Sequence, residues 1–337
     1  MTLTVGAGAG GTAVSTVGEL FELGWSTMHD AFAVHADAQL DDVPGPVAVL
    51  GIDETRRGRP TWSQDPGTLR WNRSELFETN FVDLTRGSDG RPGGQGLLGQ
   101  TAGRTKKGVV TWLEELSQDW RDGIKIVAMD PCATYRRAVE EALPKALVVA
   151  DHFHLVRLAN TALTQVRQRV TRQTTGGRGL AKDPVWANRR KLLRAREHLS
   201  DRAFTKMWNG LVDGDPSGQI LAAWIAKEEL RALLATAKRG GQRHDIAHRL
   251  TRFYAWCAGP GQSIPELQRL ATTIDAWWPE VLGFLTTDVT NAGTEGTNRL
   301  IEDTARTAFG FRNLENQRRR VRYACTRRTR LATVTCS

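Results

Sequence analysis

Cysteine is scarce in this sequence of 337 residues, and its four occurrences are scattered. No two of them form a CxxC pair, which excludes a disulfide framework and a zinc site built from thiolates. We therefore expect the protein to work in a reducing, cytoplasmic compartment. The four positions are Cys132, Cys257, Cys325 and Cys336.

Long apolar runs are also missing. No stretch of the sequence approaches the roughly 20 apolar residues that a membrane-spanning helix needs. The first residues, MTLTVGAGAGGTAV, lack the basic segment that opens a secretory signal peptide. We expect no membrane partner.

Acidic residues are in deficit: 37 Asp and Glu stand against 46 Lys and Arg, which gives a net charge of +9. Such an excess favours a polyanionic partner, most often nucleic acid. A basic surface that binds nothing explains the composition equally well. The length suits two domains, or one domain with a large insertion.

Residues 1–45 are expected to form two short helices around Leu23 and Gly24, because their apolar side chains fall at helical spacing. The pattern fits the end of a helix-turn-helix, whose second helix would carry Trp25 and His29. A generic helical hairpin fits it equally well.

Residues 46–160 alternate between apolar strand-like runs and helical patterns. Three strands, a helix, a strand, a helix and a strand follow one another, and this order predicts an α/β fold with helices packed on a mixed sheet. The strands are PVAVLGIDE, LFETNFVDLTRG, GQGLLGQTAG, IKIVAMD and ALVVAD, and the helices are TKKGVVTWLEELSQDW and TYRRAVEEAL.

Strand patterns vanish in residues 161–287, which show helical periodicity throughout and are rich in Trp and Arg. Residues 288–337 predict a helix, a short turn and a strongly basic helix. We therefore expect a helical block placed between two parts of the α/β domain.

Three acids occupy positions that local packing does not explain. Asp53 and Asp130 each close an apolar strand, and Glu295 lies near the start of a helix. Any one of them alone is more often a strand-end cap or a surface acid. Acids at the ends of adjacent strands, joined by a third from a helix, can hold two divalent cations for phosphoryl transfer. Their hard oxygen atoms suit Mg²⁺, with Mn²⁺ as a substitute.

The densest polar cluster is VVADHFHLV, where Asp151 ends a strand and His152 and His154 follow. Its carboxylate and imidazoles could form a metal site or an acid–base pair. Asp151 is therefore an alternative to Asp130 as the second metal-binding acid. The alternative for the two histidines is a buried imidazole bonded to the backbone.

Three segments, GIDET, MDPCATYRRAVEEALPKALVVADHFHLVRLAN and NAGTEGTNRLIEDTARTAFGFRN, resemble the catalytic region of the ISL-three family of bacterial insertion-sequence transposases. The resemblance covers roughly residues 15–325. It implies an RNase H-like core interrupted by an all-α insertion, and DNA cleavage and strand transfer under two-metal activation. Asp53, Asp130 and Glu295 match the family's three acids.

The same resemblance assigns Asp151 and His154 a supporting role, as a DxxH motif beside the active site. It divides the chain into a helix-turn-helix remnant (1–45), the first part of the core (46–160), the helical insertion (161–287) and a last part with the catalytic Glu (288–337). Family members usually begin with a cysteine-containing zinc module, which this sequence lacks. We therefore expect a truncated copy, a fragment or a misassigned start, with terminal-repeat recognition in doubt.

Other acids have less claim on the metals. Asp83 lies on the second strand, and Glu54 should point away from Asp53 because side chains alternate along a strand. Glu302 lies on the same helix face as Glu295 and could replace it, although pairing with an arginine explains it better.

The expected partners are DNA, as transposon ends and target, and a second copy of the chain on the paired ends. This partner implies a cytoplasmic, nucleoid-associated protein. Two rivals stay open: a catalytically silent transposon-derived DNA-binding protein, and an RNase H-like structure-specific nuclease. The candidate phosphate contacts are Lys106, Lys107, Arg157, Arg312, Arg318 and Arg319.

Overall fold

The computed structural model describes residues 13–334 except 41–42, 61, 88, 91–92 and 312, and side chains only as far as residue 326. The chain divides into two compact units. The core unit comprises residues 1–148 and 291–337, and the helical unit comprises residues 149–290. No helix in the described ranges has both the length and the apolar character needed to cross a membrane.

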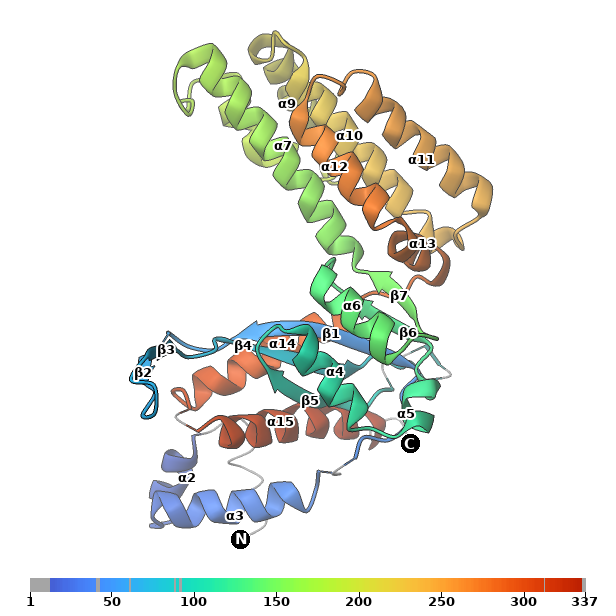
Figure 1. Ribbon diagram of the computed structural model, residues 1–337. Coiled ribbons are helices and arrows are strands. Elements are labelled where there is room, and N and C mark those ends of the chain that lie inside the picture. Colours follow the sequence, from blue (N-terminus) through green and yellow to red (C-terminus); the bar gives the residue numbers. More distant parts are fainter. Residues whose placement is uncertain are drawn as a thin grey trace. The chain divides into compact units, whose positions relative to one another are not determined.

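A five-stranded mixed sheet organises the core unit, in the order β5-β4-β1-β6-β7 (Figure 1). β1 pairs antiparallel with β4 and parallel with β6, and β4 pairs antiparallel with β5. All five strands coincide with the apolar runs of the sequence, so the predicted mixed sheet is confirmed. The strands are β1 (Val49–Arg56), β4 (Phe77–Asp83), β5 (Gly96–Ala102), β6 (Ile126–Met129) and β7 (Leu147–Ala150).

Helices cover both faces of this sheet. On one face, Val82 and Leu97 pack with Ile301 of α14 (Ala292–Thr307) and with Val321 of α15 (Leu314–Val334). On the other face, Phe81 stacks on Trp112 of α4 (Lys106–Glu114), with ring centroids 3.8 Å apart.

A single helix predicted over TKKGVVTWLEELSQDW is wrong in detail. It divides into α4 and α5 (Gln118–Gly123), because the Ser117 hydroxyl accepts a hydrogen bond from the Trp120 amide and caps a new helix. The next helix is α6 (Ala133–Ala142), as expected.

The N-terminal helices α2 (Val14–Leu20) and α3 (Trp25–Asp37) flank Leu23 and Gly24 as predicted. α3 packs on α15 through Phe32, Ala36 and Tyr323. The sequence reading overlooked a separate antiparallel ribbon of β2 (Trp62–Gln64) and β3 (Trp71–Arg73). Its two short strands are fully exposed, so no apolar alternation marked them.

From residue 151 to residue 290 every element is helical (Figure 1). α10 packs between α7 and α11. Its Lys227 is fully buried, and the ammonium donates hydrogen bonds to the Leu192 and Arg194 carbonyls at 2.7 and 2.8 Å. The helices are α7 (His152–Thr175), α8 (Pro184–Leu192), η1 (Arg196–His198), α9 (Asp201–Gly214), α10 (Gln219–Leu234), η2 (Ala237–Arg239), α11 (Arg243–Ala258), α12 (Pro265–Ala276) and α13 (Trp278–Thr287).

Candidate active site

Asp53 and Asp130 directly follow the paired stretch of two neighbouring parallel strands. Asp130 follows the end of β6 as predicted, whereas the prediction that Asp53 closes its strand is wrong, because β1 continues to Arg56 through its pairing with β4. The last registered pair between β1 and β6 is Ile52 with Met129. Asp53 is the next residue of β1, and Asp130 directly follows β6. Because the two strands run parallel and in register up to this pair, the backbones of the two acids lie on neighbouring strands, one residue beyond it. Both are half-buried.

The Asp53 carboxylate is held from two directions. Its Oδ1 accepts the Glu54 amide at 2.8 Å, and its Oδ2 accepts the Asn298 side-chain amide at 2.7 Å. A carboxylate oxygen has two lone pairs, so these bonds still permit a metal contact.

Glu54 points to the opposite face of the sheet, as predicted. Its carboxylate accepts a hydrogen bond from the Tyr135 hydroxyl at 3.1 Å on α6 and from Arg104 at 3.4 Å. Burial raises the pKa of the Tyr135 hydroxyl far above its ordinary value, so it remains a donor. Glu54 therefore has a structural partner away from Asp53.

Glu295 lies in the first turn of α14, whose N-terminus packs on β1. The Asn291 side chain donates to the Ile52 carbonyl at 3.3 Å. A Cβ atom at Gly51 would lie 2.0 Å from the Thr294 hydroxyl, so only glycine permits this approach. The helix thereby brings Thr294, the neighbour of Glu295, against the strand that carries Asp53.

The Glu295 carboxylate itself turns to Arg299, one helical turn away, at 2.7 Å. Both side chains are more than half exposed. An exposed pair of this kind contributes about 0–1 kcal/mol, so a competing positive charge can displace Arg299 at little cost. The structure thus brings the first turn of α14 against β1, while the Glu295 carboxylate is directed to Arg299.

Asp151 and His154 form a hydrogen-bonded pair at the start of α7. His154 Nδ1 lies 3.1 Å from Asp151 Oδ2, and His152 Nδ1 lies 3.5 Å from Asp151 Oδ1. Burial disfavours the charged carboxylate, yet the bonds from both imidazoles outweigh it and hold the pKa of Asp151 well below its ordinary range. The His152 ring also stacks on Phe284, 4.9 Å away, which gives it a packing role.

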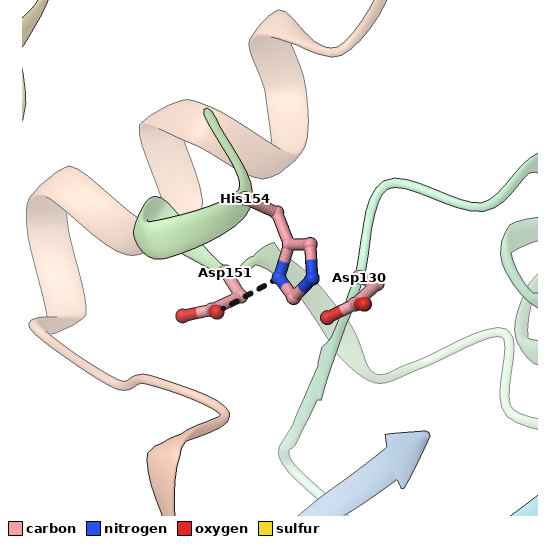
Figure 2. Close-up of side chains that lie close together, drawn as sticks. All are labelled: Asp130, Asp151 and His154. Atoms are coloured by element: carbon pink, nitrogen blue, oxygen red, sulfur yellow. Dashed lines mark hydrogen bonds and ion pairs between the residues drawn. The ribbon is translucent and has the colours of Figure 1, made fainter. Parts of the chain in front are cut away.

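Figure 2 shows Asp130 with Asp151 and His154. Asp130 follows β6, Asp151 follows the neighbouring strand β7, and His154 lies in the first turn of α7. Each of the three offers one ligand atom, and these atoms lie within 4.8 Å of one another. Asp53 and Glu295 are not in this group. Within the described ranges it is the one such cluster of three acids or imidazoles.

The remaining candidate acids, Asp83 and Glu302, show no sign of a ligand role. Asp83 accepts the amides of Thr85 and Gln95 at 2.9 and 2.8 Å and so shapes the turn after β4. Glu302 is exposed on α14. Neither arrangement indicates a ligand.

The predicted phosphate contacts fall into three groups. Lys107 and Arg157 are exposed, and Lys106 is paired with Glu141. Arg319 bonds Asp37 at 2.7 Å, and Arg318 donates to Glu78 at 2.7 Å. Arg312 lies outside the described residues.

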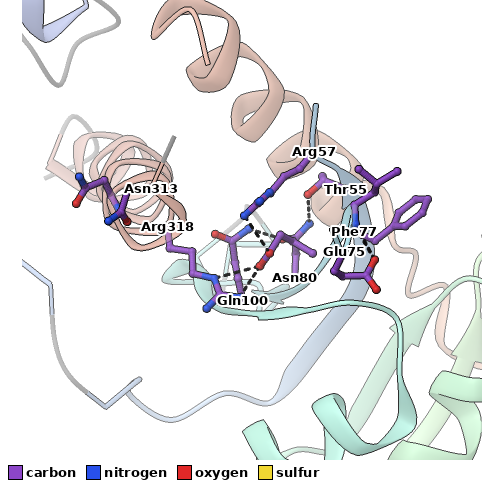
Figure 3. Close-up of polar contacts among 11 residues, drawn as sticks. Thr55, Arg57, Glu75, Phe77, Asn80, Gln100, Asn313 and Arg318 are labelled. Atoms are coloured by element: carbon purple, nitrogen blue, oxygen red, sulfur yellow. Dashed lines mark hydrogen bonds and ion pairs between the residues drawn. The ribbon is translucent and has the colours of Figure 1, made fainter. Parts of the chain in front are cut away.

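Arg318 has a structural partner in addition to its predicted role. Glu78 is 3% exposed, and its carboxylate also forms an ion pair with Arg57 at 3.6 Å. Two guanidinium groups therefore converge on one buried carboxylate. Figure 3 labels the two arginines, Arg57 and Arg318. The Arg318–Glu78 pair fastens α15 to β4.

Sequence reasoning overlooked Asn298, although it contacts Asp53 directly. A signal was present, because Asn298 follows Glu295 by three residues and shares its side of α14. The buried amides that support it on β4 and β5 were also overlooked.

Comparison with known proteins gives a consistent set of relatives. The family model for ISL-three DDE enzymes, described as "Transposase", matches residues 68–321. This range includes Asp130, Asp151, His154 and Glu295 and begins after Asp53.

Among individual proteins, the transposase for insertion sequence element IS1001 of Bordetella parapertussis is 24% identical over 309 residues, 90% of this chain and 67% of that protein. The transposase for IS1557 of Mycobacterium tuberculosis is 25% identical over 316 residues, 89% of this chain and 65% of that protein. The chain thus spans about two thirds of the length of these relatives.

A solved structure, the Drosophila P element transposase strand transfer complex, aligns over 97% of this chain and 91% of that one. The TM-score is 0.45 and the identity is 10%. A likeness of this degree does not by itself establish a common fold.

Proposed function

The chain belongs to the ISL-three family of transposases, and we propose that it cuts the ends of an insertion sequence and joins them to target DNA by two-metal phosphoryl transfer. The observation that carries this proposal is that Asp53 and Asp130 directly follow the last registered pair of β1 and β6, with the first turn of the helix that bears Glu295 against β1.

The strand order supports an RNase H-like core as part of the proposal. In chain order the sheet has three antiparallel strands, with β6 added in parallel beside the first. The core would be formed by residues 46–160 and 288–337, with residues 161–287 as an all-α insertion and 1–45 as part of a DNA-binding region.

The donor set fits hard divalent cations. Asp53, Asp130 and Glu295 offer carboxylate oxygens, the ligands that suit Mg²⁺ and Mn²⁺. When bound, two such ions would activate an attacking hydroxyl and stabilise the leaving oxygen. Asp151 and His154, hydrogen-bonded to each other, would support Asp130 from the next strand.

The residues of the chain would contribute orientation and charge. The bonds from the Glu54 amide and from Asn298 fix the Asp53 carboxylate before DNA arrives. The exposed Lys107 and Arg157, and the excess of basic residues, would neutralise DNA phosphates without selecting a sequence. Two active sites are needed for two transposon ends, so we propose a homodimer on nucleoid DNA.

The test is strand joining by the Asp130→Asn variant, on oligonucleotides that carry the inverted repeats flanking the gene. We expect Mg²⁺-dependent joining to fall at least about a thousandfold, equivalent to ~4 kcal/mol, while DNA binding persists. Undiminished joining would remove Asp130 from the mechanism.

The rivals give different outcomes in the same assay. Asp151→Asn should retain measurable joining, and loss equal to that of Asp130→Asn would make Asp151 the second acid. Binding of repeats with neither cutting nor joining by the wild-type chain would indicate the catalytically silent protein. Cutting without joining would indicate the nuclease.

A further inference from the structure

A row of polar side chains crosses three strands of the core sheet and ends at Asp53. In the antiparallel register, Gln100 of β5 lies opposite Asn80 of β4, and Asn80 lies opposite Asp53 of β1. Directly opposed residues project from the same face of a sheet, so the three side chains form one line.

Asn298 closes this line from the helix that covers the face. Gln100 Nε2 donates to Asn80 Oδ1 at 2.7 Å, and Asn80 Nδ2 donates to Asn298 Oδ1 at 2.9 Å. Asn298 Nδ2 then donates to Asp53 Oδ2 at 2.7 Å. Figure 3 shows the Gln100 and Asn80 part of the row, together with Thr55, which accepts a second bond from Asn80 at 3.2 Å.

Gln100 begins the row as a donor, and Asn80 and Asn298 each accept through the side-chain oxygen and donate through the nitrogen toward Asp53. Dipoles aligned in this way polarise one another, and the last bond is strengthened by the charge of its acceptor. The row therefore stabilises one orientation of an ionised Asp53 carboxylate.

Asn80 and Asn298 are buried, unlike the polar side chains that are usual on a protein surface. Asn80 is fully buried and Asn298 is 9% exposed. Buried amides cost free energy unless they are hydrogen-bonded, and apolar residues fill comparable positions nearby, such as Val82 on the same face of β4. Simple packing does not require a polar line here.

We propose that Asn298 is a positioning residue, which through the Gln100–Asn80–Asn298 row holds the Asp53 carboxylate in the orientation that binds the metal. This inference rests on the proposed function, in which Asp53 is a metal ligand. Asn298 also lies three residues after Glu295, so the same bond fixes the helix that carries the third acid to the strand that carries the first.

The experiment measures Mn²⁺ binding to the full chain by isothermal titration calorimetry without DNA. Loss of a partner that orients a metal ligand typically costs 10–100-fold in metal affinity. We expect Asn298→Leu and the isosteric Asn298→Asp each to weaken the Asp53-dependent binding about tenfold or more. Asn80→Asp, which cannot donate to Asn298, should weaken it in the same direction by a smaller factor.

Two controls separate positioning from folding. Thr304→Val alters the same helix at a hydroxyl that bonds only the Leu300 carbonyl at 2.8 Å, and it should leave Mn²⁺ affinity unchanged. The melting temperature of each variant without metal reports its fold. Excess Mn²⁺ should restore DNA joining in Asn298→Asp, a recovery that a merely structural defect would not produce.

The outcomes distinguish the two levels of the proposal. If Asp53→Ala leaves Mn²⁺ binding unchanged, Asp53 is not a ligand and the proposed function itself fails. If Asp53→Ala abolishes binding while folded Asn298→Leu and Asn298→Asp bind Mn²⁺ as tightly as the wild type, the positioning role of Asn298 is overturned alone.

Discussion

Ile52 on β1 and Met129 on β6 form the last registered pair between the two parallel strands at the centre of the core sheet. This pairing places Asp53 and Asp130, the next residue of each chain segment, on neighbouring strands at the edge where the β1–β6 pairing ends. Two acids that are 77 residues apart in sequence, at positions 53 and 130, thereby become neighbours. The predictions that follow concern what is built around that edge.

The close approach of α14 to β1 depends on Gly51. We predict that Gly51→Ala destabilises the fold by about 1–3 kcal/mol and impairs joining, because its Cβ would meet the Thr294 hydroxyl and Leu84. Urea unfolding measures the change. Gly296→Ala on the same helix is the matched control, since its Cβ meets no atom within 4 Å and should stabilise by roughly 0.5–1 kcal/mol. Equal stability of both variants would contradict this packing.

The identity of the third acid can be decided on one helix. Glu295→Gln should abolish Mg²⁺-dependent joining, because the metal loses the carboxylate ligand that α14 supplies. Glu302→Gln, an exposed acid two turns later, should retain activity within about twofold, since solvated surface charges contribute little. Joining rates at saturating Mg²⁺ make the comparison, and the opposite ranking would assign the role to Glu302.

Arg318 and Lys107 should affect different properties. Arg318→Met leaves the buried Glu78 with a single, longer contact to Arg57, so we predict a loss of about 1–3 kcal/mol in urea unfolding. Lys107→Gln should leave stability unchanged and reduce the salt dependence of DNA binding by about 0.9 in logarithmic slope. A stable Arg318→Met variant with a reduced salt slope would make Arg318 chiefly a phosphate contact.

The helical unit contains a carboxylate whose ionisation stabilises it. Paired bonds from Arg169, at 2.8 and 2.9 Å, lower the pKa of Glu266 below its ordinary value of 4.5. A depressed pKa in the folded state gives stability that is present above the ordinary value and lost as pH falls through the folded one.

Glu266→Gln should therefore flatten the decline of melting temperature below about pH 4.5. Asp201→Asn, at a side chain that is 99% exposed, should leave the acid limb as in the wild type. If the melting temperatures of Glu266→Gln and the wild type fall equally as the pH decreases, ionisation of Glu266 beside Arg169 does not contribute to the stability of the folded state.

Much of the core sheet could be predicted because most of its strands are apolar runs with buried residues. The ends of two such runs also identified Asp53 and Asp130 as acids without a packing role. The β2–β3 ribbon escaped prediction because its stability comes from a turn, in which Asp65 accepts the Gly67 and Thr68 amides, and not from burial.

The amide row escaped for a different reason. Asn80 and Gln100 stand next to other polar residues of their strands, Glu78 and Thr79 on β4 and Thr101 on β5, so nothing in the sequence singles them out. Their purpose emerges only from the cross-strand register that aligns them with Asp53. Periodicity along one segment carries no information about that register. The grouping of Asp130 with Asp151 and His154 likewise depends on the order of β6 and β7 in the sheet.

The central claim is that Asp130 binds a divalent ion during DNA joining, and metal rescue tests it most directly. A thiolate binds Mn²⁺ better than the harder Mg²⁺. We predict that the Asp130→Cys variant is inactive in strand joining with Mg²⁺ and regains joining with Mn²⁺, whereas the wild type joins with both. Joining by Asp130→Cys at the wild-type rate in Mg²⁺ would contradict the claim.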